Sequence, residues 1–229
     1  MKYIRITKEN IDKEHICCAM SGRQSVAKKE WLRQRFDDGL VFYRSEERGK
    51  CFIEYIPAEN AWVPIAADGY LYINCLWVSG SMKGHGYSND LLEACIRDAK
   101  EQGKKGICIL CAEGRKREFL ADPKFLTYKG FCTADISDCG INLMYLPIES
   151  GIQPPHFKEC AKHPVIKEAG LFSITPISVH IPIIGCQGCR RQRRSMVSRS
   201  RPSISLIKNL RRMYPHRSRP MPCSGTVSF

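Results

Sequence analysis

The run Lys-Gly-His-Gly-Tyr-Ser at Lys83–Ser88 places small residues and a cation between an apolar stretch, Leu71–Val78, and a helical pattern. A helix N-terminus presents up to about four unpaired N–H groups and roughly half a positive charge, so it binds anions. Gly84 and Gly86 allow a backbone to approach a pyrophosphate closely and to adopt positive φ. The chemistry that these residues suggest is the binding of a phosphate group by main-chain amides.

The glycine spacing of this loop matches neither of two common nucleotide motifs. In a dinucleotide-binding G-x-G-x-x-G the third glycine would stand at Asn89, and a P-loop needs a G-K-[ST]. Spacing alone therefore leaves two possibilities open: a phosphate loop, to which Lys83 adds a mobile cation, and a glycine-rich turn without a ligand. His85 likewise either contacts a ligand or lies in solvent.

A strand and a helix must position the loop, and the patterns on its two sides predict both. Residues 69–78 lack clean alternation, which is typical of a central strand covered on both faces. An apolar stripe at Leu91, Cys95 and Ala99 predicts a helix that Gly103 ends. Further strands are predicted at 2–7, 40–57 (a hairpin), 106–112 and 141–148, and further helices at 11–20, 27–39 and 117–131. This order predicts an α/β fold with a mixed central β-sheet and flanking helices.

Three residues of the loop fit a longer motif: an Arg or Gln, two residues, a Gly, one residue, then a Gly or Ala. Lys83, Gly86 and Ser88 occupy those positions, with Lys and Ser as departures, and a helical region ending in Gly130-Phe131 follows. In this arrangement the sequence resembles the GCN5-related N-acetyltransferase (GNAT) family.

Four other stretches narrow the resemblance: ENIDKEHICCAM from Glu9, GKCFIEYIPAENAWVPI from Gly49, INCLWVSG from Ile73 and HFKECAK from His156. They are similar to a GNAT subfamily that has a YoaP-type C-terminal domain, and the likeness covers about residues 1–172. It implies a GNAT acyl-CoA N-acyltransferase fold, which we expect as an N-acetyltransferase domain over residues 1–165.

The resemblance also implies how acetyl-CoA binds as co-substrate. Its pantetheine arm would lie between the strands near Cys75–Val78 and Ile107–Cys111. An amine would attack the thioester directly, while a backbone N–H of Leu76, Trp77 or Val78 polarises the carbonyl oxygen. The pyrophosphate would rest on the loop made of Lys83, Gly84, His85, Gly86, Tyr87 and Ser88.

The resemblance is less informative about proton transfer. Many members of the family protonate the departing thiolate with a Tyr four residues before the Gly130 position, and this sequence has Leu126 there. Tyr128 is the candidate acid, with a packing or surface tyrosine as the alternative. Glu54, in the predicted hairpin, is the candidate base, with a structural Glu as the alternative.

Charge divides the 229-residue chain into two parts. All 23 acidic residues precede residue 169, whereas Ser173–Phe229 holds eleven of the 36 Lys and Arg residues. Residues 1–172 therefore carry a net charge of +2 and the last 57 carry +11. We expect residues 166–229 to be a disordered basic tail rich in Ser, Pro and Arg, which would attract nucleic acid through its phosphates.

A second interpretation of the tail is a changed reading frame. The related subfamily continues into a small thioredoxin-like domain with a Cys-Pro motif. Shifting Ser173–Phe229 by one base, with third codon bases free to vary, can give an acid-containing string with helical periodicity and a Cys-Pro pair. The tail would then be an out-of-frame remnant that begins at about residue 173, which resequencing of the gene would decide.

Three functions are carried forward: an acetyl-CoA-dependent N-acetyltransferase that acts on an amine, a nucleic-acid-binding adaptor that acts through the tail, and a CoA-binding pseudoenzyme. The start of the chain shows no apolar signal region, so we expect a cytoplasmic protein with most of its 13 cysteines reduced, and no membrane partner. Cys108 and Cys111 would point to opposite faces of a strand, and Cys186 and Cys189 lack a second close pair, so no metal site is expected.

Overall fold

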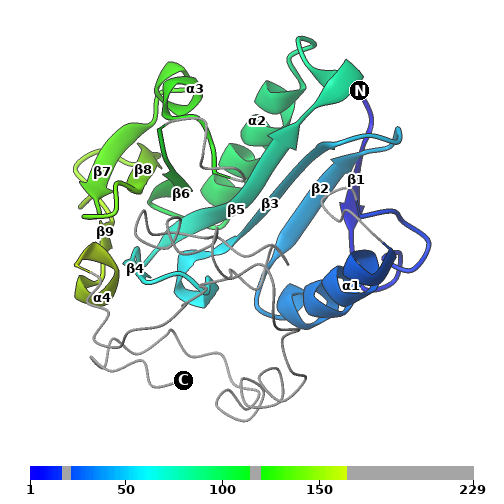
Figure 1. Ribbon diagram of the computed structural model, residues 1–229, viewed down its shortest axis with the longest axis horizontal. Coiled ribbons are helices and arrows are strands. Elements are labelled where there is room, and N and C mark those ends of the chain that lie inside the picture. The colour runs from blue at the N-terminus through cyan, green and yellow to red at the C-terminus, as the bar shows by residue number, and fades with distance from the viewer. Residues whose placement is uncertain (17–21, 114–119, 164–229) are drawn as a thin grey trace, which may run out of the picture.

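The computed structural model describes residues 1–16, 22–113 and 120–163. Its centre is a seven-stranded sheet in the order β1-β2-β3-β5-β6-β8-β7 (Figure 1). The strands of this sheet are β1 (Tyr3–Ile6), β2 (Val41–Ser45), β3 (Cys51–Pro57), β5 (Tyr70–Val78), β6 (Gly106–Cys111), β7 (Cys132–Ile136) and β8 (Asn142–Pro147). A separate pair of short strands joins β4 (Ile65–Ala66) to β9 (His156–Phe157).

Strand directions in the large sheet are mixed. All neighbours pair antiparallel except β5 and β6, which run parallel. A parallel pair needs a crossover, and the helix α2 (Tyr87–Glu101) provides it. The predicted mixed α/β sheet is therefore confirmed.

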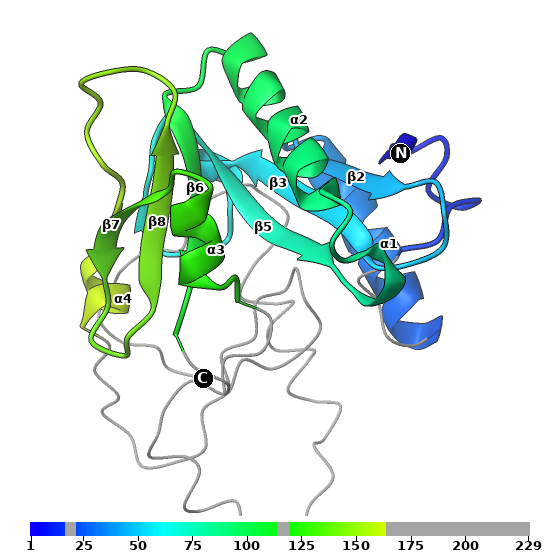
Figure 2. The same cartoon turned by 90° about the horizontal axis from the view of Figure 1, so that it is seen from above.

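Helices cover both faces of the sheet. The helix α1 (Gly22–Phe36) lies on one face, and α2 lies on the other (Figure 2). Two apolar clusters result, one containing Trp31 and Leu32 of α1 and the other containing Leu91 of α2 and Leu126 of α3 (Pro123–Tyr128). The remaining helical segments are η1 (Ala58–Asn60), η2 (Gly80–Met82) and α4 (Glu159–Lys162).

The two longest helices begin and end for local reasons. The turn after α1 bends at Gly39, where φ is +84°. Gly86 caps the start of α2 in the left-handed conformation, and Gly103 follows its end with φ of +60°. The apolar stripe predicted for α2 is buried at Leu91, Cys95 and Ala99.

One predicted helix is wrong over its described part. Residues 11–13 form turns and residues 14–16 are irregular, instead of the first half of a helix over 11–20, and the remaining residues lie outside the described ranges. The side chain of Asn10 closes a local turn: its Oδ1 accepts from the amide of Thr7 at 2.8 Å, and its Nδ2 donates to the carbonyl of Arg5. Asn side chains favour such turns in competition with helices.

Three strands were not predicted. The strand β7 lies at the edge of the sheet and is mostly exposed, so it carries little apolar pattern. The pair β4 and β9 has two residues in each strand, too few for any periodicity.

The two cysteines of β6 face opposite sides of the sheet. Cys108 packs in the α1-side cluster and Cys111 in the α2-side cluster, as the strand pattern predicts.

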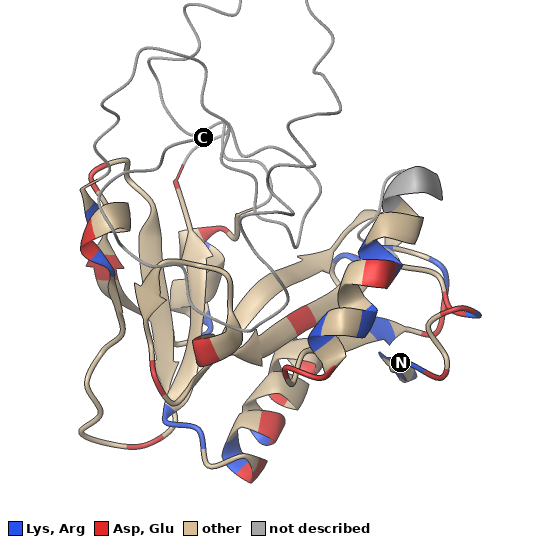
Figure 3. Cartoon of the chain, turned by 90° about the horizontal axis from the view of Figure 1, so that it is seen from below, with Lys and Arg blue, Asp and Glu red and all other residues tan. Residues whose placement is uncertain are grey.

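Both signs of charge occur along α1 and α2 (Figure 3), in keeping with the small net charge expected before residue 172. The predicted domain boundary at residue 165, the basic tail, the proposed frame change and the pair Cys186 and Cys189 all lie outside the described residues. Within the described ranges, no helix is long and apolar enough to cross a bilayer, and no cluster of His, Cys, Asp and Glu is arranged to hold a metal ion.

Candidate active site

The strands β5 and β6 separate half-way along β5. Their parallel pairing runs from Tyr70 opposite Gly106 to Ile73 opposite Ile109, whereas β5 continues to Val78. Residues 70–73 are buried, and residues 74–78 are partly exposed. Figure 2 shows the two strands diverging. The second half of β5 is thus bonded to β3 on one side, and on the other it pairs with none of the described strands.

A β-bulge lies where the two strands part. On β3, Tyr55 pairs with Ile73 and Glu54 pairs with Cys75, so Asn74 is an extra residue in β5. A bulge bends its strand and increases the local twist. The bend carries β5 away from β6 immediately after the last paired residue.

Glu54, the candidate base, is buried opposite the bulge. Its side chain is 1% exposed, and its two oxygens have different partners. Oε1 accepts a hydrogen bond of 2.9 Å from Nδ2 of Asn74, and Oε2 lies 2.7 Å from Nζ of Lys28 on α1. The ammonium of Lys28 also lies 4.0 Å from the ring centroid of Trp31. One buried polar network therefore joins α1, β3 and β5.

The loop Lys83–Ser88 has the backbone that the sequence predicts. Gly84 and Gly86 have φ of +83° and +78°, values that side chains disfavour. A Cβ added to Gly84 would meet no atom within 4 Å, so this side of the loop is open. None of the amides of residues 84–88 donates a hydrogen bond to another described residue. These donors, together with the exposed cation of Lys83, are available to an anion.

The hairpin between β2 and β3 packs against the end of β5 and the residues that precede this loop. The amide of Ser79 donates to the carbonyl of Lys50 at 2.8 Å, and the side chain of Met82 is buried against Gly49. The ammonium of Lys50 lies 5.0 Å from the ring centroid of Trp77. These contacts hold the end of β5 and the beginning of the loop in one fixed position.

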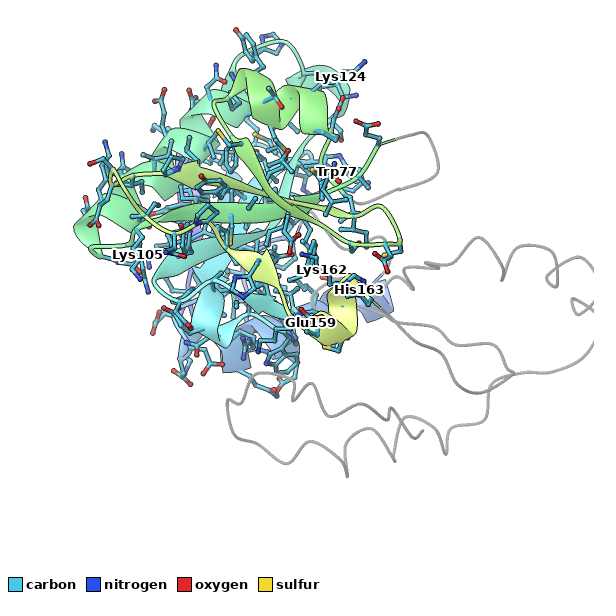
Figure 4. All side chains as sticks on the ribbon, turned by 90° about the vertical axis from the view of Figure 1, so that its left-hand side faces the viewer. Trp77, Lys105, Lys124, Glu159, Lys162 and His163 are labelled. Carbon is cyan, nitrogen blue, oxygen red and sulfur yellow. The ribbon has the colours of Figure 1, made fainter. Side chains whose placement is uncertain are left out.

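The ends of β5 lie on opposite sides of the molecule. Trp77 and Lys105 are far apart in Figure 4, and the amide of Lys105 bonds to Gly69 at the start of β5. Trp77 packs with the cluster on the α1 side, and Leu76 and Val78 pack with the cluster on the α2 side. Alternate amides of an antiparallel strand point away from its partner, so the outer edge of residues 75–78 presents N–H groups to the space beside β6.

This geometry can be compared with known proteins. The family model described as "Acetyltransferase (GNAT) family" matches residues 9–117. A curated relative from Bacillus subtilis (strain 168), "Uncharacterized N-acetyltransferase YoaP", is 47% identical over 175 residues, which are 75% of this chain and 69% of the relative. The chain belongs to the GNAT family. Membership confirms the predicted fold class, the N-acetyltransferase assignment and acetyl-CoA as co-substrate.

Two solved acetyltransferase structures each align with about two thirds of this chain. A putative GNAT acetyltransferase from Desulfovibrio desulfuricans is 14% identical with a TM-score of 0.46, covering 65% of this chain and 99% of its own. The PaiA N-acetyltransferase from Thermoplasma acidophilum, solved with coenzyme A, is 13% identical with a TM-score of 0.44, covering 64% and 99%. The family assignment itself rests on the two sequence matches.

The residues of the GNAT loop motif stand together at the start of α2. Lys83 precedes the two glycines, and Tyr87 and Ser88 are the first residues of the helix. The ring of His85 stacks on that of Tyr87 with 5.4 Å between centroids. Figure 2 shows the end of β5 leading into the start of α2. The structure thus brings Leu76, Trp77, Val78 and the loop together on consecutive elements.

Tyr128, the candidate acid, stands apart from Glu54. Its side chain is 81% exposed at the end of α3, with the ammonium of Lys129 at 4.6 Å from its ring centroid. Leu126, at the position of the family's tyrosine, is fully buried in the α2-side cluster. The two predicted proton-transfer residues therefore lie on different elements, Glu54 on β3 and Tyr128 on α3, and their roles stay predictions.

Sequence reasoning overlooked Asn74 and Lys28. Asn74 was visible as the one amide side chain within the apolar run of residues 69–78. Lys28 carried no such signal, because it is one of several basic residues on α1, and its burial, which Arg35 shares, depends on how the helix packs. Tyr72, two residues before Asn74 on β5, is also buried. Burial raises the pKa of its hydroxyl, so this group stays protonated.

Proposed function

We propose that the protein transfers the acetyl group of acetyl-CoA directly to the nitrogen of an amine acceptor. The observation that carries the proposal is the position of two features on one continuous stretch of chain. The part of β5 beyond Ile73, where its pairing with β6 ends, leads into a loop whose amides at 84–88 donate no hydrogen bond to another described residue. The first feature suits a pantetheine arm, and the second suits a pyrophosphate.

The residues present fit this co-substrate. Amides beside a helix N-terminus attract the negative charge of a diphosphate, and Lys83 adds a full positive charge. The N–H groups on the edge of residues 76–78 that faces away from β3 suit the carbonyl oxygen of a thioester, which becomes more negative as an amine attacks the carbon. The new C–N bond forms as the C–S bond breaks, and the amine's proton leaves to a base while the thiolate takes a proton.

The departing thiolate also needs a proton donor. We propose Tyr128, which lies two residues after Leu126, the position of the family's tyrosine, and is exposed at the end of α3. A Tyr128→Phe variant should then lower kcat and remove the alkaline limb of the pH–rate profile. Retention of that limb would remove Tyr128 from the mechanism and leave acetyl transfer itself in place.

One observation favours the pseudoenzyme as a second candidate. Leu126 is buried where the GNAT family often has a proton-donating tyrosine, so the chain lacks that donor. A protein of this kind would bind CoA through the same loop without turnover. A single-turnover assay with acetyl-CoA and a panel of primary amines and amino-terminal peptides distinguishes the two: acetylated product indicates the enzyme, and tight binding without product indicates the pseudoenzyme.

Stabilisation by CoA tests what the two candidates share. A ligand that binds only the folded state stabilises it by RT ln(1 + [L]/Kd), about 2.7 kcal/mol at a hundredfold excess over Kd. We expect the thermal midpoint to rise with CoA and to rise less with dephosphorylated pantetheine, which lacks the pyrophosphate. An unchanged midpoint at millimolar CoA would contradict both candidates. A cytoplasmic location stays a prediction of the sequence.

A further inference from the structure

We propose that Glu54 is a positioning residue that, together with Lys28, fixes the bulge at Asn74 and so sets where β5 leaves β6. The inference rests on the proposed function, because the separated part of β5 is the proposed site of the thioester. It assigns Glu54 the structural role that the sequence left open as the alternative to a proton acceptor. The argument starts from the extra residue in β5.

Asn74 needs a polar partner because the bulge turns it toward the protein interior. Ile73 and Leu76 pack on the α2 side and Cys75 packs on the α1 side, so the inserted residue allows two successive side chains to face α1. The carboxylate directly opposite the insertion, Glu54, accepts the Asn74 amide at 2.9 Å. The bulged residue Asn74 and its hydrogen-bond partner Glu54 therefore lie opposite one another in the register of β5 against β3.

Glu54 in turn needs a cation, because a buried carboxylate is strongly disfavoured unless it is paired. Lys28 supplies that cation at 2.7 Å, and its own side chain is 5% exposed. The ion pair with Lys28 restricts the conformations that the side chain of Glu54 can adopt. As a result α1, which packs on the other face of the sheet from the loop, is connected to Asn74. The connection runs through the side chains of Lys28 and Glu54 to the residue at which β5 bends.

The network is adjacent to the point where the strands separate. Ile73, the last residue of β5 that pairs with β6, immediately precedes Asn74. Loss of the bulge would slip β5 by one residue against β3 and exchange the faces of every side chain beyond it, including Leu76 and Trp77. It would also turn a different set of N–H groups toward the space beside β6. Holding Asn74 thus fixes which amides face the proposed thioester.

The same contacts argue against a direct role of Glu54 as proton acceptor. A general base must reach the proton that it removes, directly or through one water. Both oxygens of Glu54 are engaged, one with an amide and one with an ammonium, and the side chain is 1% exposed.

Amide hydrogen exchange tests the inference without any ligand. In Asn74→Ala, exchange of residues 74–78 should become about tenfold faster, while residues 70–73, which β6 holds, should change little. The matched control is Asn60→Ala, which removes a comparable hydrogen bond of 2.8 Å, from Asn60 to the carbonyl of Asp38, and should leave both segments unchanged. Unchanged exchange at 74–78 in Asn74→Ala would overturn the inference, whatever the protein does with CoA.

A second variant separates positioning from proton transfer. Because Glu54→Gln alone leaves Lys28 buried without its carboxylate, the double variant Lys28→Met/Glu54→Gln is used, which retains an oxygen for Asn74. If Glu54 positions the bulge, kcat falls by less than about tenfold and the acidic limb of the pH–rate profile persists; loss of a base would cost about 10²–10⁴-fold. Loss of that limb overturns the inference. Failure of the wild-type protein to bind CoA would refute the proposed function instead. Hydrogen exchange alone would then show whether Lys28, Glu54 and Asn74 fix the bulge.

Discussion

The hydroxyl of Tyr55 on β3 donates a hydrogen bond of 2.5 Å to Oδ2 of Asp98 on α2, and both side chains are buried. This bond ties the helix that begins at the proposed phosphate loop to the strand that carries Glu54. Burial, with the bond to Asp98 as a further cause, raises the pKa of Tyr55, so the hydroxyl stays protonated and donates at all physiological pH values.

Removal of this hydroxyl should destabilise the fold. Tyr55→Phe leaves the carboxylate of Asp98 buried without its donor, and such a loss costs about 1–3 kcal/mol, with charged groups at the upper end. Urea unfolding should show a lower midpoint with an unchanged slope. The double variant Tyr55→Phe/Asp98→Leu should be less destabilised than Tyr55→Phe alone, because no polar group is then left unpaired. Equal destabilisation of the two variants would show that the bond contributes little.

The two loop glycines should be necessary for CoA affinity. Gly86→Val places a β-branched residue at a positive φ and adds a side chain beside the free amides, so we expect the Kd for CoA to rise more than tenfold, about 1.4 kcal/mol. Calorimetric titration measures it. The control is Gly103→Val, at the other end of α2, where φ is also positive and an added Cβ meets nothing within 4 Å. Equal loss of affinity in both variants would indicate backbone strain rather than contact with the ligand.

Lys83 should contribute through its charge. We expect Lys83→Ala to weaken CoA binding about three- to tenfold at low salt, and the difference from wild type to shrink as salt screens the exposed charge. Lys100→Ala removes an equal charge from the last turn of α2 and should leave the affinity unchanged. A Lys83→Ala difference that does not depend on salt would argue for a role other than electrostatic attraction.

Stability should fall in mild acid because of His15. Burial, and then the charges of Arg44 and Arg48, lower the pKa of His15 below its ordinary value of 6.5, although Glu14 acts in the opposite direction. The folded protein therefore binds fewer protons than the unfolded chain between the two pKa values, so stability is constant above pH 6.5 and is lost as the pH falls below it.

Urea midpoints measured from pH 5 to pH 8 should show this loss in the wild-type protein and less of it in His15→Asn. His156→Asn, which changes an exposed histidine on β9, should keep the wild-type dependence. If His15→Asn and the wild-type protein have the same slope below pH 6.5, another group causes the acid sensitivity.

Several parts of the site were predictable because they depend on neighbouring residues only. Gly84 and Gly86 adopt positive φ since other residues do so at a cost, and the stripe from Leu91 to Ala99 is periodic within one helix. The opposite faces of Cys108 and Cys111 follow from the alternation of a strand. The likeness of the loop and its flanking stretches to GNAT sequences indicated the family before any coordinates.

Other features depend on segments that lie far apart in the sequence. The bulge at Asn74 exists only in the register of β5 against β3, and the burial of Lys28 depends on where α1 packs. Glu54 illustrates the difference most directly. As a sequence position it was an acidic residue on a strand and so a candidate base; its partners, 20 and 26 residues away along the chain, make it one member of a buried network.

The sequence by itself determined the family, the backbone of the glycine loop and the alternation of strands and helices, because each of these depends on short stretches of adjacent residues. The tertiary structure decided which strand edge is left open and which polar groups are buried together. Those properties arise from the packing of α1, β3 and β5 against one another. Contacts between residues that are distant in the sequence produce no pattern within a short stretch of it.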